Sequence, residues 1–534
     1  MQRPTSPPAP FLPKSYQLGI LFVLNCVLFL PSLGYEFTGL DDTLLIVQNE
    51  GYLTQPSNIF DTFRHDVFYN PTLPQEMANV YYRPLLTMSF MWDSIVGGQS
   101  RLFCHLTNVA LHMANTYIVL ILLSLLAVSA AAAFWGALFF AIHPVLAQAV
   151  CWVPGRNDSL LALFVLLSVI FFVKYIRTQK PVFLLSHVLS FAFGLFTKET
   201  AIAVPLIVFT FCWIYENKKA FLDRIWTFLL LYAVVIVPWF FLRANVVSQS
   251  KANLSIGALT ESFIRNIPVY FQMVQKLVLP VNLSLLSTPQ DHNYLLLAVA
   301  LLLLAALFYF SRNVSYKKVL FGFLWFNAFL LPTFLVHILT GFEHRVYLPF
   351  IGFLIMLLET DFLKDLKLRH SYRLYTSVAF LVLLFAINLN HVKAFSNGFE
   401  FWKTASDSSP HSSLAKLNYG ARLTEQGKLP EALQVYLEGI NINPLEPKLH
   451  NNIGIIYART GKLDPAEQEF KKEIEINPLY SDAHFNLGVL YSQKHDLPRA
   501  IDCWMKALEL NPNHERAKSF LNRFAGGIQP AQSQ

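Results

Sequence analysis

Long runs of apolar residues are the feature that most constrains the fold of this chain. Two of them, LLALFVLLSVIFFVKYI and YLLLAVALLLLAALFYF, approach the roughly 20 residues that a helix needs to cross a bilayer. Only 14% of the residues are charged, whereas 54% are hydrophobic. Soluble domains carry about 25% charged residues. The sequence therefore predicts an all-α, polytopic transmembrane helical bundle rather than a soluble protein.

Eleven apolar segments are predicted to span the membrane. They are residues 16–34, 103–127, 129–146, 156–174, 181–197, 200–215, 225–243, 293–310, 319–339, 346–359 and 372–390. The first has a basic flank and no small-x-small cleavage site, so we interpret it as a retained span. The apolar stretch 266–285 is interpreted instead as lying on the surface or re-entering from outside. A full span there would put Lys317 and Lys318 on the wrong side of the membrane.

Basic residues in alternate connections set the predicted orientation, because positive loops mark the cytoplasmic side. These residues are Arg3, Lys14, Lys174, Arg177, Lys180, Lys218, Lys219, Arg224, Arg312, Lys317, Lys318, Lys364, Lys367 and Arg369. The N-terminal tail, residues 1–15, is then cytoplasmic. The large loop 35–102, with eight acidic and three basic residues, lies outside together with the C-terminal region. The outside is either a bacterial periplasm or the lumen of the endoplasmic reticulum.

The C-terminal hundred residues repeat with a period of 34, set by Pro410, Pro444, Pro478 and Pro512. Glycine, alanine and aromatic residues recur in phase, namely Gly420, Gly454 and Gly488, Ala432, Ala466 and Ala500, and Tyr436, Phe470 and Trp504. This is the pattern of an α-solenoid of about three tetratricopeptide repeats, whose concave groove binds peptides or proteins. A stabilising cap on the membrane domain is the alternative role.

The predicted domain order follows from these assignments. The membrane domain covers residues 16–390, a linker 391–409, the repeats 410–522 and a disordered tail 523–534. Residues 410–512 carry 11 basic and 13 acidic side chains, so the repeats are not predicted to bind nucleic acid.

Two adjacent acids, Asp41 and Asp42, follow the first predicted span in the stretch YEFTGLDDTLLIVQNE. Because neighbouring carboxylates repel, one of them can hold a raised pKa and act as a general base. Alternatively, the pair coordinates a divalent ion or caps the following helix. The two residues alone do not decide between these roles.

Cationic and polar residues recur at the ends of other segments predicted to face outside. The candidate phosphate ligands are Arg83, Arg156, Lys198 and Arg345. The candidate supporting residues are His143, Asp158, Glu199, Glu343 and His344. Interfacial anchors, helix caps and ion pairs in tight hairpins are the alternative roles. Since the topology places all of them on the side of Asp41 and Asp42, we expect them to gather in one pocket. A base and several cations there suit transfer from an anionic lipid-linked donor.

The order of the motifs resembles that of the transmembrane and tetratricopeptide-repeat O-mannosyltransferase family, within the GT-C class of polyprenyl-phosphate-sugar-dependent glycosyltransferases. The resemblance runs through LDDTLLIVQNEGYL, YYRPLLTMSF, HPVLAQAVCWVPGRNDSLLALFVLLS, FTKETAIAVPLI and EHRVYLPFIGF, and ends in the repeats. It implies that the acidic motif is the catalytic centre, that the basic residues hold the donor phosphate, and that the repeats present an acceptor protein. The chain differs from the family at Gln148, where an acid is usual, and in having only about three repeats.

We therefore predict an inverting membrane glycosyltransferase that transfers a sugar, mannose by resemblance, from a polyprenyl phosphate to a hydroxyl acceptor on protein. Asp41 or Asp42 deprotonates the hydroxyl, and the cations stabilise the departing lipid phosphate. Because the phosphate leaves with its own charge, no metal or other cofactor is predicted. One alternative is a non-catalytic membrane scaffold whose repeats recruit proteins. Another is a GT-C enzyme that acts on a lipid or glycan acceptor.

Overall fold

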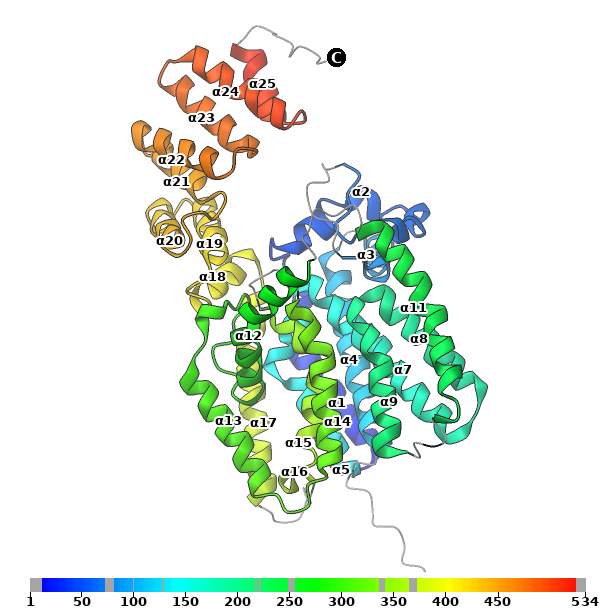
Figure 1. Ribbon diagram of the computed structural model, residues 1–534. Helices are drawn as coiled ribbons and strands as arrows, with labels where there is room; N and C mark the ends of the chain where they lie inside the picture. The colour runs from blue at the N-terminus through cyan, green and yellow to red at the C-terminus, as the bar shows by residue number, and fades with distance from the viewer. Residues whose placement is uncertain are drawn as a thin grey trace, which may run out of the picture. The chain divides into compact units, whose positions relative to one another are not determined.

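The computed structural model describes residues 12–72, 81–98, 100–126, 129–216, 219, 222–247, 255–335, 341–364 and 372–524. Within these ranges the secondary structure is helical, with no β-strand and one isolated bridge between Ser287 and Gly341. The chain forms two compact units, Met1–Phe401 and Trp402–Gln534 (Figure 1). The all-α class predicted from the sequence is confirmed.

Each of the eleven predicted spans overlaps a helix of the first unit, although residue 127 and residues 336–339 of two predicted spans lie outside the described residues. These helices are α1 (Lys14–Phe29), α4 (Arg101–Leu125), α5 (Ala130–Ile142), α7 (Arg156–Thr178), α8 (Pro181–Thr197), α9 (Val204–Tyr215), α11 (Ile225–Val247), α13 (Tyr294–Tyr309), α14 (Tyr316–Leu330), α15 (Pro349–Leu357) and α17 (Tyr372–His391). Among the described residues, five helical stretches are long and apolar enough to cross a membrane alone: Lys14–Gly34, Arg101–Leu125, Val153–Thr178, Ile225–Val247 and Leu374–Phe395. A sixth crosses if a bent pair counts as one span. The first unit is thus a multi-pass membrane unit, and the number eleven stays a prediction.

The bent pair breaks where the sequence places His143 and Pro144. α5 ends at Ile142, and the chain continues at 54° through η5 (Pro144–Leu146) and α6 (Ala147–Cys151). A broken helix within a membrane protein needs partners for its free backbone groups. His112 and Asn388 supply them: His112 Nε2 lies 3.2 Å from the Ala141 carbonyl, and the Asn388 amide donates to the Ile142 carbonyl at 3.0 Å.

The stretch 266–285 lies in α12 (Ile256–Val278) and the loop that follows it. Among the described residues, α12 is not one of the helices that are long and apolar enough to cross a membrane. Its buried face is polar as well as apolar and includes Gln272, Gln275 and Lys276. The orientation of the membrane unit stays a prediction. Four of the basic residues on which it rests, Arg3, Lys218, Lys367 and Arg369, lie outside the described ranges.

The described part of the loop 35–102, which is predicted to be external, and the residues just before it fold into short helices and one longer helix. They are η1 (Leu30–Gly34), η2 (Thr43–Val47), α2 (Glu50–Leu53), η3 (Pro56–Asn58), η4 (Asp61–Arg64) and α3 (Pro84–Gly97). Leu45, Tyr52, Leu86 and Phe90 belong to its small hydrophobic core. The carboxylates and Arg83 therefore sit on an ordered scaffold.

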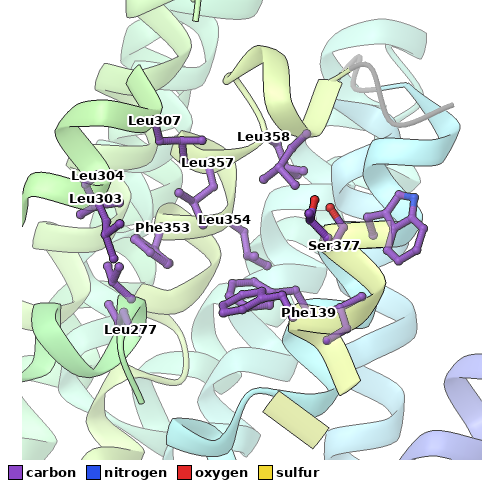
Figure 2. A pocket seen from close by; sticks show the side chains of 17 residues that line it. Phe139, Leu277, Leu303, Leu304, Leu307, Phe353, Leu354, Leu357, Leu358 and Ser377 are labelled. Atoms are coloured by element: carbon purple, nitrogen blue, oxygen red, sulfur yellow. The ribbon is translucent and has the colours of Figure 1, made fainter. Parts of the chain in front are cut away.

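An apolar cavity of about 380 Å³ lies within the membrane unit, between α5, α12, α13, α15 and α17. Figure 2 shows Leu303, Leu304 and Leu307 on one side of it and Phe139 and Leu358 on the other. Leucine and phenylalanine make up most of the lining, and the described lining residues include no ionisable side chain. The cavity therefore provides no group for acid–base chemistry.

The second unit holds the repeats as three helix pairs and a last single helix. The pairs are α19 (Ser413–Glu425) with α20 (Leu429–Ile442), α21 (Leu449–Arg459) with α22 (Leu463–Ile476) and α23 (Ser481–Gln493) with α24 (Leu497–Leu510), followed by α25 (Glu515–Phe524). The predicted linker 391–409 is helical as well, in η11 (Val392–Phe395) and α18 (Gly398–Ser408). The predicted tail 523–534 falls mostly outside the described residues.

The repeated glycines are where the two helices of each pair meet. A Cβ on Gly420 would overlap the ring of Tyr436, one on Gly454 would lie 2.7 Å from Phe470, and one on Gly488 would lie 2.6 Å from Trp504. Tyr436, Phe470 and Trp504 are buried, at 1%, 1% and 0% exposure. The aromatic residue of the second helix therefore occupies the space that the glycine leaves open.

This packing makes the glycines sensitive to substitution. Gly454→Leu is expected to lower the free energy of unfolding of the repeat unit by about 1–3 kcal/mol, because the Phe470 ring has no room to move. Hydrogen exchange of α21 and α22 in the full chain measures the effect. Glu475→Leu, at an exposed position of the same α22, is the control and should leave exchange unchanged. Equal protection in both variants would contradict the packing argument.

Candidate active site

Asp41 and Asp42 occupy different environments, although they are neighbours. The amide and hydroxyl of Thr38 donate to Asp42 Oδ2 at 2.6 and 2.9 Å, and Asp42 is 1% exposed. Asp42 therefore closes the turn of residues 38–42. Asp41 is half-buried, and its carboxylate makes no hydrogen bond or ion pair with the described part of the chain. Of the two, Asp41 is the carboxylate left available for chemistry.

The surroundings of Asp41 raise its pKa to about 6. Burial is the main cause, and repulsion by Asp42 adds to it. The positive charges of Arg83 and Arg345 act in the opposite sense and hold the pKa below the value that burial alone would give. A carboxyl with this pKa is ionised at neutral pH and can still accept a proton readily.

Arg83 and Glu199 form the outer part of the cluster. Arg83 precedes Pro84, the first residue of α3, and Glu199 begins η7 (Glu199–Ala203). Two nitrogens of Arg83 contact the two carboxylate oxygens of Glu199, at 3.0 and 3.4 Å. The Arg83 guanidinium also lies over the ring of Tyr81, 4.4 Å from its centre. Its side chain stays 12% exposed, and its remaining N–H groups can bind a further anion.

Lys198 and Asp158 form a buried pair in the same cluster. Lys198 Nζ lies 2.8 and 2.9 Å from the two oxygens of Asp158, which stands in the first turn of α7. His344 Nε2 is 3.7 Å from Asp158 Oδ2. Lys198 and Asp158 are 4% and 2% exposed. Lys198 therefore faces a carboxylate rather than open space, which differs from the predicted role as a direct phosphate ligand.

His344 and Arg345 stand in η10 (Glu343–Val346), and the broken helix α6 fixes their position. The backbone amide of His344 donates to Gln148 Oε1 at 2.9 Å, and Gln148 Nε2 donates to the Leu285 carbonyl at 3.0 Å. The Arg345 guanidinium lies 5.2 Å from the centre of the Phe342 ring. Trp152 stacks on that ring, with centroids 5.7 Å apart and planes at 5°. Arg345 is thus held at the edge of an aromatic stack.

Arg156 does not belong to this cluster. Its side chain is 0% exposed and pairs with Asp93 of α3 at 2.5 Å. It also donates to Asn108 Oδ1, the Ser89 carbonyl and the Cys104 carbonyl, at 2.7, 3.1 and 2.8 Å. The N–H donors of Arg156 are therefore engaged inside the protein. Its role as a phosphate ligand stays a prediction, and these contacts do not support it.

Glu343 and His143 lie in a second buried network rather than in the cluster around Asp41. Glu343 pairs with Lys276 of α12 at 3.0 Å and with His391 at 3.2 Å. His143 Nε2 contacts the Leu277 carbonyl at 3.2 Å, and its Nδ1 accepts from the Val145 amide at 3.3 Å. Both residues therefore support the fold near the site.

The structure thus brings Asp41, Arg83, Asp158, Lys198, Glu199, His344 and Arg345 together. In the described ranges, no group of three histidine, cysteine, aspartate or glutamate side chains could hold a metal ion. From the sequence, Gln148 stands out only as a departure from the family and has no assigned role, and Lys276 and Asp93 are missed. Each of the three acts by pairing with a residue distant in the sequence. For Lys276, a charge inside an apolar stretch is the signal that the sequence offers.

The repeats match known families. The TPR repeat family matches residues 420–461, and the Tetratricopeptide repeat family matches residues 447–478 and 481–514. The predicted repeat domain type is confirmed. Among solved structures, the first TPR domain of human RPAP3 is 28% identical, over 22% of this chain and 93% of that chain, with a TM-score of 0.21.

Curated proteins cover more of the chain. Human protein O-mannosyl-transferase TMTC2 is 31% identical over 156 residues, 29% of this chain and 18% of that protein. Human protein O-mannosyl-transferase TMTC1 is 23% identical over 510 residues, 81% of this chain and 56% of that protein. The chain therefore spans about half the length of TMTC1. The resemblance to O-mannosyltransferases with tetratricopeptide repeats is confirmed.

Proposed function

We propose that this chain is a membrane glycosyltransferase that moves mannose from a polyprenyl-phosphate donor to a hydroxyl group of an acceptor protein. The observation that carries the proposal is Asp41: a half-buried carboxylate with a pKa of about 6, within the fields of Arg83 and Arg345. The similarity to protein O-mannosyl-transferases over 81% of the chain supports the sugar and the acceptor class.

The proposed reaction is a single displacement with inversion at the anomeric carbon. Asp41 takes the proton of the acceptor hydroxyl, and the acceptor oxygen bonds to the anomeric carbon from the face opposite the phosphate. The bond between that carbon and the phosphate oxygen breaks, and its electron pair leaves with the polyprenyl phosphate. General-base catalysis of this kind contributes about 10²–10⁴-fold to the rate.

Arg83 and Arg345 are the proposed ligands of the donor phosphate. Both are only partly buried, and both act electrostatically on Asp41, so an anion between them would lie close to the base. Their charges stabilise the phosphate more as it takes on the electrons of the breaking bond. The Lys198–Asp158 pair and Glu199 hold these arginines in place; Asp158 and Glu199 act electrostatically on both of them.

The acceptor is proposed to be a polypeptide bound by the repeat unit. Tetratricopeptide arrays bind extended segments in their concave groove. Because the reaction site lies at the ends of the predicted spans, we place it on the non-cytoplasmic side, in the periplasm or the lumen of the endoplasmic reticulum. The positive loops on the opposite side support this orientation.

The direct test uses the purified full chain in lipid nanodiscs. Polyprenyl-phosphate mannose and polyprenyl-phosphate glucose, each labelled in the sugar, are incubated with it and a mixture of unfolded secretory proteins. We expect label from the mannose donor to move to protein. If neither label moves while the repeat unit still retains proteins, the rival function, a non-catalytic scaffold, replaces this one.

The rate of transfer should fall as the pH drops through about 6. Asp41 acts in its ionised form, and its pKa is raised from 3.8 to about 6. From that pKa, kcat/KM near pH 5 should be roughly a tenth of its value at pH 7. Because the Arg83 charge lowers the pKa of Asp41, Arg83→Gln should move the acid limb of the profile to higher pH. A profile flat between pH 5 and 7 would exclude Asp41 as the base.

A further inference from the structure

The segment 341–346, which carries His344 and Arg345, is fixed to α12 and the loop after it. Ser287 and Gly341 form a two-bond antiparallel bridge, with N–O distances of 2.9 and 2.6 Å. A Cβ on Gly341 would overlap Val269 of α12, so the backbone of the segment lies directly against this helix. The segment therefore takes its position from α12.

A buried ion pair joins the same two elements. Lys276 of α12 lies 3.0 Å from Glu343 Oε1 and also donates to the hydroxyls of Ser284 and Ser287, at 2.5 and 2.9 Å. The Ser284 amide donates to the same Glu343 oxygen at 2.8 Å. The side chains of Lys276 and Glu343 are 4% and 2% exposed. A carboxylate this deeply buried depends on its partner, because an unpaired buried charge is strongly unfavourable.

The backbone connects this pair to Arg345. Glu343, His344 and Arg345 are consecutive in one short turn, η10, so a shift of the Glu343 backbone carries the next two residues with it. The Arg345 side chain in turn influences the pKa of Asp41. A displacement of about 1 Å at a reacting centre is enough to cost on the order of 10²-fold in rate.

We propose that Lys276 is a positioning residue of the donor site, which acts through Glu343 to hold Arg345 where it can bind the donor phosphate. This inference rests on the proposed function, because it assigns Arg345 to the phosphate. The proposal also gives α12 a role as a scaffold for the site. This helix is not counted among the membrane spans predicted from the sequence. Because the Lys276 side chain is only 4% exposed, the proposal gives it no direct contact with the donor or the acceptor.

A double-mutant cycle tests the inference in the full chain, with polyprenyl-phosphate mannose as the donor. Lys276→Met and Arg345→Gln are each expected to lower kcat/KM, Lys276→Met by about 10²-fold. The kcat/KM of the double variant is expected to be no more than a few-fold below that of the less active single variant. The reason is that the first substitution already removes the interaction that the second one would remove. Lys276→Arg, which keeps the pair, should recover most of the activity.

Lys318→Met is the control. It removes the longer of two lysine pairs with another buried carboxylate, Glu359, at 3.5 Å, and it leaves the Lys364 pair at 2.7 Å in place. Its effect should add to that of Arg345→Gln. The thermal midpoint of each variant is measured, and Lys276→Gln replaces Lys276→Met in the cycle if the latter does not fold.

Three outcomes are distinct. If the wild-type chain transfers mannose but the effects of Lys276→Met and Arg345→Gln on kcat/KM simply add, the positioning role alone is overturned. Strong coupling that Lys318→Met does not share supports it. A wild-type chain that transfers no mannose overturns the proposed function, and the positioning role with it.

Discussion

Asp41→Asn is expected to lower kcat for mannosyl transfer by about 10²–10⁴-fold, the range that a general base contributes. The amide has nearly the shape of the carboxylate, but it cannot take the proton of the acceptor hydroxyl. Because Asp41 makes no hydrogen bond or ion pair with the described residues, the variant should fold like the wild type. Single-turnover kinetics with labelled polyprenyl-phosphate mannose, together with the thermal midpoint, measure both properties.

Asp42→Asn is the matched control, because it makes the same chemical change one residue away. It weakens the bonds from the Thr38 amide and hydroxyl, which the buried carboxylate accepts. Hydrogen bonds to a charged group are worth about 1.5–3 kcal/mol, so we expect a lower thermal midpoint with a modest change in kcat. The reverse pattern, with transfer kept in Asp41→Asn and lost in Asp42→Asn, would assign the base to Asp42.

The helices could be predicted well because their signal is local. Each predicted span overlaps a helix, since a run of apolar residues needs no distant partner to be recognised. The same holds for the repeats. In each one a glycine is followed sixteen positions later by an aromatic residue, as in Gly454 and Phe470, and the two meet in the structure. The number of membrane crossings is harder to predict, because several of these helices are shorter than a bilayer is thick.

The candidate site could be predicted only in part, because its pairs are not local. The predicted topology puts Asp41, Arg83, Lys198 and Arg345 on one side of the membrane, and the structure places them in one cluster. The sequence does not show which of these cations is already paired with a carboxylate. Lys198 is matched by Asp158, 40 positions away. A single sequence carries no sign of such a match.

Arg156→Met is expected to destabilise the membrane unit by about 3–5 kcal/mol, the cost of removing one partner of a buried ion pair. The substitution leaves Asp93 without its counter-charge, and Asp93 is 1% exposed. It also removes donors from the carbonyls of Ser89 and Cys104 and the guanidinium from the face of Phe90, 4.7 Å away. Thermal unfolding in detergent and the yield of folded chain measure the loss.

The double variant Arg156→Met, Asp93→Leu separates this structural role from phosphate binding. It removes both charges, and apolar side chains of similar volume can replace a buried ion pair with little loss of stability. Part of the cost should remain, because the Thr107 hydroxyl, which donates to Asp93 at 2.6 Å, loses its acceptor. The double variant should therefore be more stable than Arg156→Met and should keep its KM for polyprenyl-phosphate mannose. If the thermal midpoint of Arg156→Met is unchanged while its KM rises tenfold or more, the arginine binds the donor and the structural assignment fails.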